Sequence, residues 1–210
     1  IPNVQDIEPF EAVSATTVQE IRHNLGIAQG EIAVAYIGGF TRNRLLLPLI
    51  LAAQGMSGFK FFLWGDGHQR QAIEAAVSGS ENARYMGWLP AAQVPEYMKA
   101  MDIIYYCLRE DYPGAMFNAP NTLSHAMSAG KPLIANRVGD LGRLVENFGC
   151  GLLLEQVSPD SIRQMLRRLE DPALRQKLGD AGYQAARNEY NWAIISQKLL
   201  DVYQALQISH

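Results

Sequence analysis

Asn118 to Pro132 is the segment of this sequence best suited to binding an anion. It reads N-A-P-N-T-L-S-H-A-M-S-A-G-K-P, a polar turn followed by an amphipathic helix that ends at Gly130, a residue type favoured at helix C-termini. The first N–H groups of a helix lack partners within the helix and carry the positive end of its dipole, so phosphate is favoured there. Asn121, Thr122 and His125 would lie near the mouth of that site. An ordinary loop, helix and strand without a ligand is the alternative for the isolated segment.

Composition and charge exclude several other classes of protein. The 210 residues, 48% hydrophobic and 19% charged, can bury the core of one large soluble domain or of a domain with an appended helical tail. A net charge of -3 argues against a nucleic-acid partner. The two cysteines, Cys107 and Cys150, are too few for a disulfide framework or a zinc cluster, so we expect no metal site and a reducing, cytoplasmic location.

No apolar run reaches the roughly 20 residues that a membrane-spanning helix needs. The polar start of the sequence is unlike a signal peptide. Peripheral attachment to a membrane, through a segment outside this sequence, stays open.

Apolar runs alternate with helical patterns from residue 32 onward. The alternation predicts an α/β fold, a doubly wound parallel six-stranded Rossmann-like sheet with C-terminal helices after Glu155. We expect residues 1–15 to be a linker, followed by a helix at 17–25. The strands are expected at 32–37, 59–64, 83–86, 103–108 and near Leu133 and Leu152, with helices at 42–53, 69–77, around 94–101 and in the segment already described.

Glycine-rich loops follow the first three predicted strands, and a long loop at 109–121 follows the fourth. The carboxyl ends of parallel strands share one edge of a sheet, where ligands bind. We therefore expect these loops to converge on one cleft, with backbone close to the ligand. The loops hold Gly38-Gly39, Gly65-Asp66-Gly67 and Gly87-Trp88-Leu89.

Thr41, Arg42 and Arg44 follow the first glycine pair and offer hydroxyl and guanidinium donors to a diphosphate. The spacing G-G-F-T-R-N-R is neither the dinucleotide fingerprint nor a P-loop, which disfavours an ordinary NAD enzyme or NTPase. Solvated charges on a helix face are the alternative for the arginines. Likewise His125 has an alternative role in satisfying a neighbouring carbonyl, and Trp88 either shelters a nucleobase or packs at the sheet edge.

In its motifs and their order the chain resembles the carboxyl-terminal half of GT-B glycosyltransferases of the family 4 type, the glycosyl transferases group 1. The resemblance spans nearly the whole chain. Its matching segments are the linker-like I-P-N-V-Q-D with Phe10, Tyr36-Ile37-Gly38-Gly39, Gly65-Asp66-Gly67, Met86-Gly87-Trp88-Leu89 and Ala126 to Pro132.

The resemblance implies a nucleotide-diphosphate sugar as donor substrate, a UDP- or GDP-sugar, without a further cofactor. Gly39 and Arg44 would then lie by the diphosphate, and the loop at 87–89 would border the base. Thr122 and Leu123 would present amides to phosphate, and position 125 would meet the ribose. Residues 16–190 would form the donor-binding domain, and 191–210 the C-terminal crossover helix.

The chain departs from the family at two positions. The family usually has glutamate at position 125 and again eight residues earlier, where this sequence has His125 and Phe117. A neutral imidazole accepts one hydrogen bond where a carboxylate accepts several. A variant pattern, P-N-K-L-x-E, also fits, because Pro120-Asn121 and Leu123 match while Thr122 replaces lysine.

Because the linker-like segment stands at residue 1, we expect the acceptor-binding amino-terminal half to be the missing partner. The isolated chain should then bind a nucleotide sugar without transferring a hexose, with Arg44 and His125 as the candidate catalytic residues. The apolar side of the last helix, around Trp192, Ile195 and Leu199, should be partly exposed. Two alternatives stay open: a non-catalytic degenerate GT-B module and a GT-B nucleotide-sugar epimerase.

Overall fold

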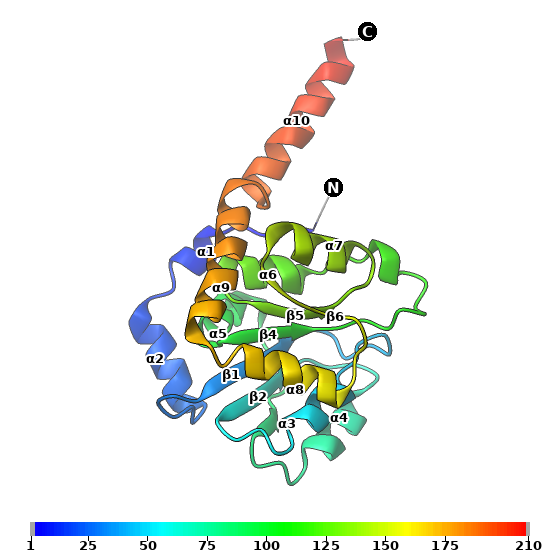
Figure 1. Ribbon diagram of the computed structural model, residues 1–210. Coiled ribbons are helices and arrows are strands. Elements are labelled where there is room, and N and C mark those ends of the chain that lie inside the picture. Colours follow the sequence, from blue (N-terminus) through cyan, green and yellow to red (C-terminus); the bar gives the residue numbers. More distant parts are fainter. Residues whose placement is uncertain (1–2, 209–210) are drawn as a thin grey trace.

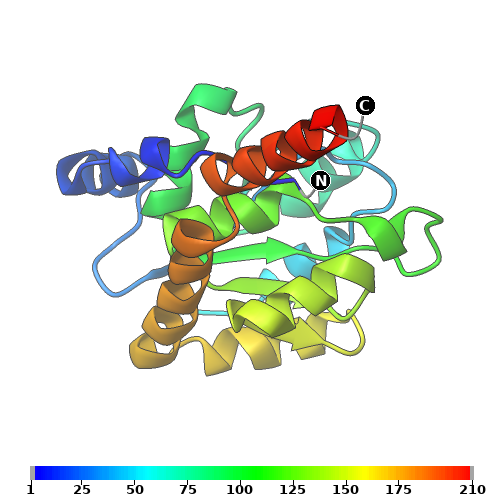
Figure 2. The same ribbon diagram turned by 90° about the horizontal axis from the view of Figure 1, so that it is seen from above.

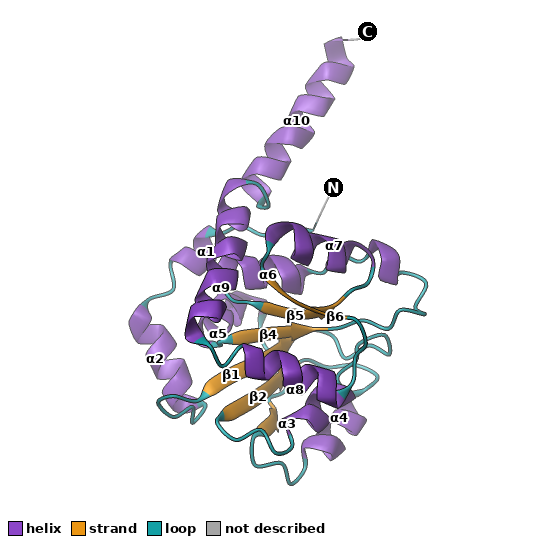
Figure 3. Ribbon diagram, in the orientation of Figure 1, coloured by secondary structure: helices purple, strands orange, loops and turns teal. Residues whose placement is uncertain are grey.

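Six parallel strands form the centre of the structure, a computed structural model that describes residues 3–208 (Figure 1; Figure 3). Their order is β3-β2-β1-β4-β5-β6, so the winding reverses between β1 and β4. The doubly wound α/β fold predicted from the sequence is confirmed. The strands are β1 Ile32–Ile37, β2 Phe59–Trp64, β3 Ala83–Tyr85, β4 Ile103–Tyr106, β5 Leu133–Asn136 and β6 Gly151–Leu154.

β1 and β2 have the bounds predicted for them because both are buried on the two faces of the sheet. All six residues of β1 are buried, and β2 has one half-buried residue, Lys60. Such strands are nearly continuous apolar runs with clear ends. β4 ends two residues earlier than predicted, since Leu108 has left the parallel ladder and forms an antiparallel bridge with Arg44.

Helices cover both faces of the sheet. α3 packs against α4 and α8, and Figure 1 shows these three helices beside one another. A second group packs in the order α2, α5, α6 and α9. The helices are α1 Glu8–Glu11, α2 Ala15–Asn24, α3 Leu47–Ala53, α4 Arg70–Val77, α5 Val94–Ala100, α6 Asn121–Ala129, α7 Gly139–Phe148, α8 Pro159–Arg168, α9 Pro172–Asn188 and α10 Trp192–Ile208, with 3-10 turns η1 Ala91–Gln93 and η2 Ala115–Phe117.

Two helices differ from the sequence-based expectation. α3 begins at Leu47 and not at residue 42, because the preceding segment pairs with the end of β4 and Pro48 stands in the first helical turn. α7 lies between β5 and β6, where no helix was predicted. Its inward residues Leu141, Leu144 and Val145 do have helical spacing, so the pattern was present in the sequence.

The N-terminal segment and the start of α10 lie side by side. Within the expected linker, of which residues 1 and 2 lie outside the described range, α1 buries Phe10 against the core. The Trp192 N–H at the start of α10 donates to the Gln5 carbonyl over 3.1 Å. α10 then projects away from the domain (Figure 1), toward the viewer when the domain is seen from above (Figure 2). The expected partial exposure of its apolar residues is confirmed, with Trp192 45% and Leu200 53% exposed. The last two residues of the expected crossover helix lie outside the described range.

Among residues 3–208, helices long and apolar enough to cross a membrane are absent.

Candidate active site

A cavity of about 510 Å³ opens at the carboxyl edge of the sheet. Ile37, Trp64 and Tyr106, the last residues of β1, β2 and β4, all line it, so it lies where the winding reverses. Nine of the fourteen residues predicted for the site also line this cavity. They are Gly38, Gly39, Arg44, Gly65, Trp88, Leu89, Asn121, Thr122 and His125.

The two glycine loops beside β1 and β2 are packed backbone to backbone. A Cβ on Gly65 would lie 1.9 Å from the Gly38 carbonyl oxygen, and Gly65 has a φ of +150°. The Phe40 N–H donates to the Asp66 carbonyl over 2.8 Å. Only glycine permits this approach, so the first two loops form one wall of the cavity.

Arg44 reaches the cavity from an irregular segment and not from a helix face. Its guanidinium carbon lies 4.7 Å from the centre of the Tyr106 ring, a cation–π contact. Within the described residues, its Nε and Nη1 atoms are buried and have no hydrogen-bond partner. Arg44 is half-buried, and buried polar atoms are normally paired, so these two nitrogens are donors available for an anion in the cavity.

Tyr36 and Tyr106 form the floor beneath Arg44. Their rings stack with centroids 6.1 Å apart, and the Tyr36 hydroxyl donates to the Gly39 carbonyl over 2.7 Å. Burial raises the pKa of Tyr106 to about 12 and that of Tyr36 further, although Arg44 opposes both shifts. Both phenols are therefore neutral. Their place in the site could not be predicted from the sequence, because aromatic residues in a buried strand are usually core.

The start of α6 forms the opposite wall. Its N-cap residue is Pro120, whose side chain provides no capping hydrogen bond. Thr122 donates its hydroxyl to the Ile37 carbonyl over 3.3 Å, which ties the start of α6 to the end of β1. The left-handed Gly130, with φ +67°, ends the helix as expected. The amide end of α6 thus faces the same cavity as Arg44.

His125 lies one turn further along α6, and its ring centroid is 5.8 Å from that of Phe10. Burial lowers the pKa of His125 to about 4. The imidazole is therefore neutral at physiological pH and offers one acceptor and one donor nitrogen.

The rim of the cavity is aromatic and exposed. Trp88 is 69% exposed and Phe117 is 84% exposed, and both line the cavity. Phe117 belongs to η2 in the long loop after β4. Among the described lining residues Arg44 is the one charged side chain, so carboxylates are missing from this part of the lining. Groups of three or more potential metal ligands are likewise absent from residues 3–208.

Five predicted residues do not line the cavity. Thr41 and Arg42 are exposed outside it, and the Thr41 hydroxyl bonds to Asn43. Leu123 is fully buried in the core. Gly67 packs against the Phe40 backbone, and the Gly87 carbonyl accepts from the Gly65 N–H over 2.8 Å.

The curated proteins that this chain resembles in sequence include glycosyltransferases. The 2-deoxystreptamine glucosyltransferase of Streptomyces kanamyceticus is 26% identical over 182 residues, which cover 82% of this chain and 45% of that protein. The lipopolysaccharide core biosynthesis glycosyltransferase LpsD of Rhizobium meliloti is 24% identical over 186 residues, 87% of this chain and 52% of that protein. The chain thus spans about half the length of the curated relatives it matches.

Solved structures share the fold. Anabaena Alr3699/HepE, crystallised in complex with UDP-glucose, matches with a TM-score of 0.82 at 18% identity, over 97% of this chain and 56% of that one. The C-terminal domain of the group 1 glycosyl transferase LpcC from Francisella tularensis matches with a TM-score of 0.69 at 19% identity, over 89% of this chain and 98% of that one. The family model described as glycosyl transferases group 1 matches residues 33–171, and the chain therefore belongs to this family of GT-B glycosyltransferases.

Proposed function

We propose that the cavity binds a nucleotide-diphosphate sugar, a UDP- or GDP-sugar, as the donor for hexosyl transfer. The observation that carries this proposal is the Arg44 guanidinium, which has two buried nitrogens without partners and lines the same cavity as the start of α6. A diphosphate supplies the negative charge and the acceptor oxygens that both groups lack.

In this proposal the chain acts by positioning and by stabilising charge. Negative charge grows on the diphosphate as the bond to the sugar breaks, and donors that are already fixed stabilise it best. Arg44 is held on the Tyr106 ring, and the α6 amides are fixed by the helix. Their interaction with the leaving diphosphate therefore strengthens as transfer proceeds.

The remaining cavity residues suit the other parts of the donor. Trp88 offers an exposed aromatic surface to the nucleobase, and Leu89 offers an apolar one. His125, a neutral imidazole, offers a hydrogen bond to a ribose hydroxyl. We propose that the acceptor is bound by a second, amino-terminal domain, since the matched relatives are about twice as long. The chain by itself then binds the donor without transferring the sugar.

Binding tests this proposal directly. Titration of the chain with UDP, GDP, ADP and UDP-glucose by calorimetry should give saturable binding of at least one uridine or guanosine ligand. Arg44→Met should weaken that binding about tenfold or more, the effect of one charge-assisted hydrogen bond. Arg42→Met is the matched control, because Arg42 is exposed outside the cavity. Equal losses in the two variants, or no binding at millimolar ligand, would contradict the proposal.

A non-catalytic donor-binding module is the second candidate. The described cavity lining holds no carboxylate, and Phe117 and His125 stand where the resemblance leads us to expect glutamates. The protein extended by an acceptor domain separates the two cases. Product detected by mass spectrometry, and lost in His125→Ala, supports the transferase; tight donor binding without transfer or hydrolysis supports the module.

A further inference from the structure

Asn136 is a fully buried polar residue at the end of β5, outside the cavity lining. The oxygen and the nitrogen of its side-chain amide both bond to the backbone of Leu108, which lies just beyond β4. Its Oδ1 accepts from the Leu108 N–H over 2.9 Å, and its Nδ2 donates to the Leu108 carbonyl over 2.8 Å. The side chain therefore takes the place that a further residue of the strand ladder would occupy.

Leu108 needs this partner because it lies beyond the paired part of β4. The pairing of β4 with β5 ends at Tyr106 opposite Ala135. Leu108 is itself fully buried, so water cannot satisfy its N–H and carbonyl groups. An unpaired buried backbone group is costly, and the Asn136 amide satisfies two of them.

The same Leu108 forms the antiparallel bridge with Arg44. Two backbone hydrogen bonds flank the bridge, from the Leu45 N–H to the Cys107 carbonyl (3.1 Å) and from the Arg109 N–H to the Asn43 carbonyl (2.9 Å). The segment that carries Arg44 is thus fastened to the segment that Asn136 holds. The segment that carries Arg44 is irregular, so its own backbone does little to fix the position of the guanidinium.

We propose that Asn136 is a positioning residue for Arg44: by holding Leu108 in place, it sets the position of the guanidinium in the cavity and so the affinity for the diphosphate. This inference rests on the proposed function for its ligand and on the hydrogen bonds for its geometry. Asn136 itself does not line the cavity. Its effect should therefore appear in the phosphate part of binding and not in the nucleoside part.

The test compares UDP with uridine in Asn136→Leu, which keeps the approximate volume and removes both hydrogen bonds. We expect UDP affinity to fall about tenfold, which corresponds to the loss of one charge-assisted hydrogen bond. Uridine affinity should stay the same. Asn136→Thr replaces the amide with a hydroxyl, which can make one of the two hydrogen bonds, and threonine suits a strand. It should therefore give a smaller loss, and it serves if the leucine variant does not fold.

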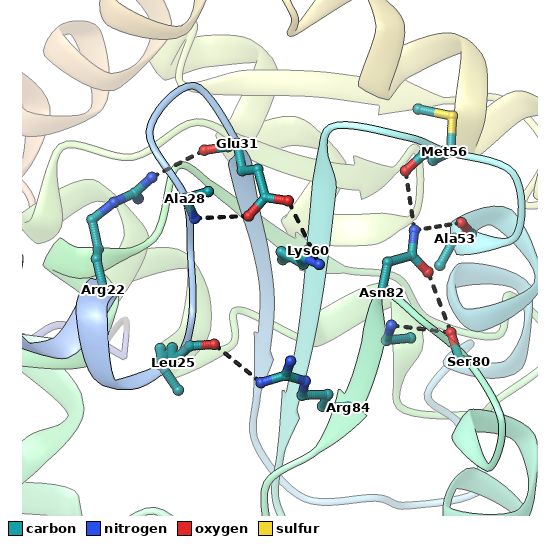
Figure 4. A network of polar contacts seen from close by, with 11 residues as sticks. Arg22, Leu25, Ala28, Glu31, Ala53, Met56, Lys60, Ser80, Asn82 and Arg84 are labelled. Atoms are coloured by element: carbon teal, nitrogen blue, oxygen red, sulfur yellow. Dashed lines mark hydrogen bonds and ion pairs between the residues drawn. The ribbon is translucent and has the colours of Figure 1, made fainter.

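Asn82→Leu is the matched control. Asn82 also donates its amide to backbone carbonyls, those of Ala53 and Met56 at 2.8 and 3.0 Å. Figure 4 shows these two hydrogen bonds and a third, between the side chains of Asn82 and Ser80. Asn82 does not line the cavity, so its variant should lose stability but keep the UDP to uridine affinity ratio of the wild type.

A second measurement needs no ligand. The Nε–H signal of Arg44 in an NMR spectrum, assigned by its loss in Arg44→Met, should shift or broaden in both Asn136 variants and stay unchanged in Asn82→Leu. If the wild type fails to bind UDP, the proposed function fails and this signal alone decides the positioning role. A folded Asn136 variant with the wild-type Arg44 signal and the wild-type affinity ratio overturns the inference.

Discussion

Replacing Arg44 by methionine should make the ligand-free protein more stable. Two buried guanidinium nitrogens without partners destabilise the fold, because each unsatisfied buried polar group costs about 1–3 kcal/mol. The cation–π contact with Tyr106 offsets about 0.5–2 kcal/mol of this. Methionine keeps the apolar stem without the charge. We therefore expect a gain of about 2 kcal/mol in the free energy of unfolding.

Saturating UDP should narrow this difference. A ligand that binds only the folded state stabilises it by about 2.7 kcal/mol at a hundredfold excess over Kd. The wild type gains this amount, whereas Arg44→Met, with an affinity about tenfold lower, gains only about 1.4 kcal/mol at the same UDP concentration. The lead of the variant in the free energy of unfolding should therefore fall from about 2 kcal/mol without ligand to about 0.7 kcal/mol with UDP.

Thermal and urea unfolding measure both effects, in a buffer free of phosphate so that no competing anion fills the cavity. A gain of 2 kcal/mol should raise Tm by roughly 4–8 °C for a chain of this size. Arg42→Met, at an exposed position, should stay within about 0.5 kcal/mol of the wild type. A ligand-free Arg44→Met that unfolds more easily than the wild type would refute the idea that this charge is unpaired.

Two other perturbations have clear expected outcomes. Gly65→Ala should destabilise the fold by about 2 kcal/mol or more, because its Cβ would lie 1.9 Å from the Gly38 carbonyl oxygen. Gly39→Ala is the control, since no atom lies nearer than 3.7 Å to its Cβ. Equal urea unfolding midpoints for the two variants would contradict the packing argument. His125 has its pKa lowered from 6.5 to about 4 by burial, so between these values the unfolded chain binds a proton that the native chain does not. Stability should fall by roughly 3 kcal/mol as pH drops from 6.5 to 4, and His125→Gln should remove most of that fall in urea titrations.

The glycine loops and the buried strands were predictable from the sequence because their signals are local. β1 is a continuous apolar run bounded by Gly38, and its observed ends match the prediction. Parallel winding then brings the ends of consecutive strands to one edge, so the convergence of the loops follows from topology. The start of α6 was predictable for the same reason, since a turn, an amphipathic segment and Gly130 define it.

The geometry of Arg44 was not predictable, because it depends on pairing between distant segments. Residues 42–46 have a helical pattern, yet Leu45 bonds to Cys107 and Arg44 bridges to Leu108. A local pattern cannot report a hydrogen bond that spans more than sixty positions. Asn136 was missed for a similar reason, since a single amide at a strand end has no spacing to mark it.

The charge of the cavity explains why the site tolerates an unpaired arginine. A carboxylate beside Arg44 would stabilise the empty domain, but it would also repel a diphosphate and compete for the same donors. The described lining instead surrounds Arg44 with neutral groups, the Tyr106 ring beneath it and the neutral His125 on α6. The ligand-free domain is thus less stable than one with an apolar residue at position 44. An anion that binds to Arg44 would offset this loss of stability. On the proposed function, the stability given up at Arg44 is recovered when the diphosphate supplies the partner that the fold does not.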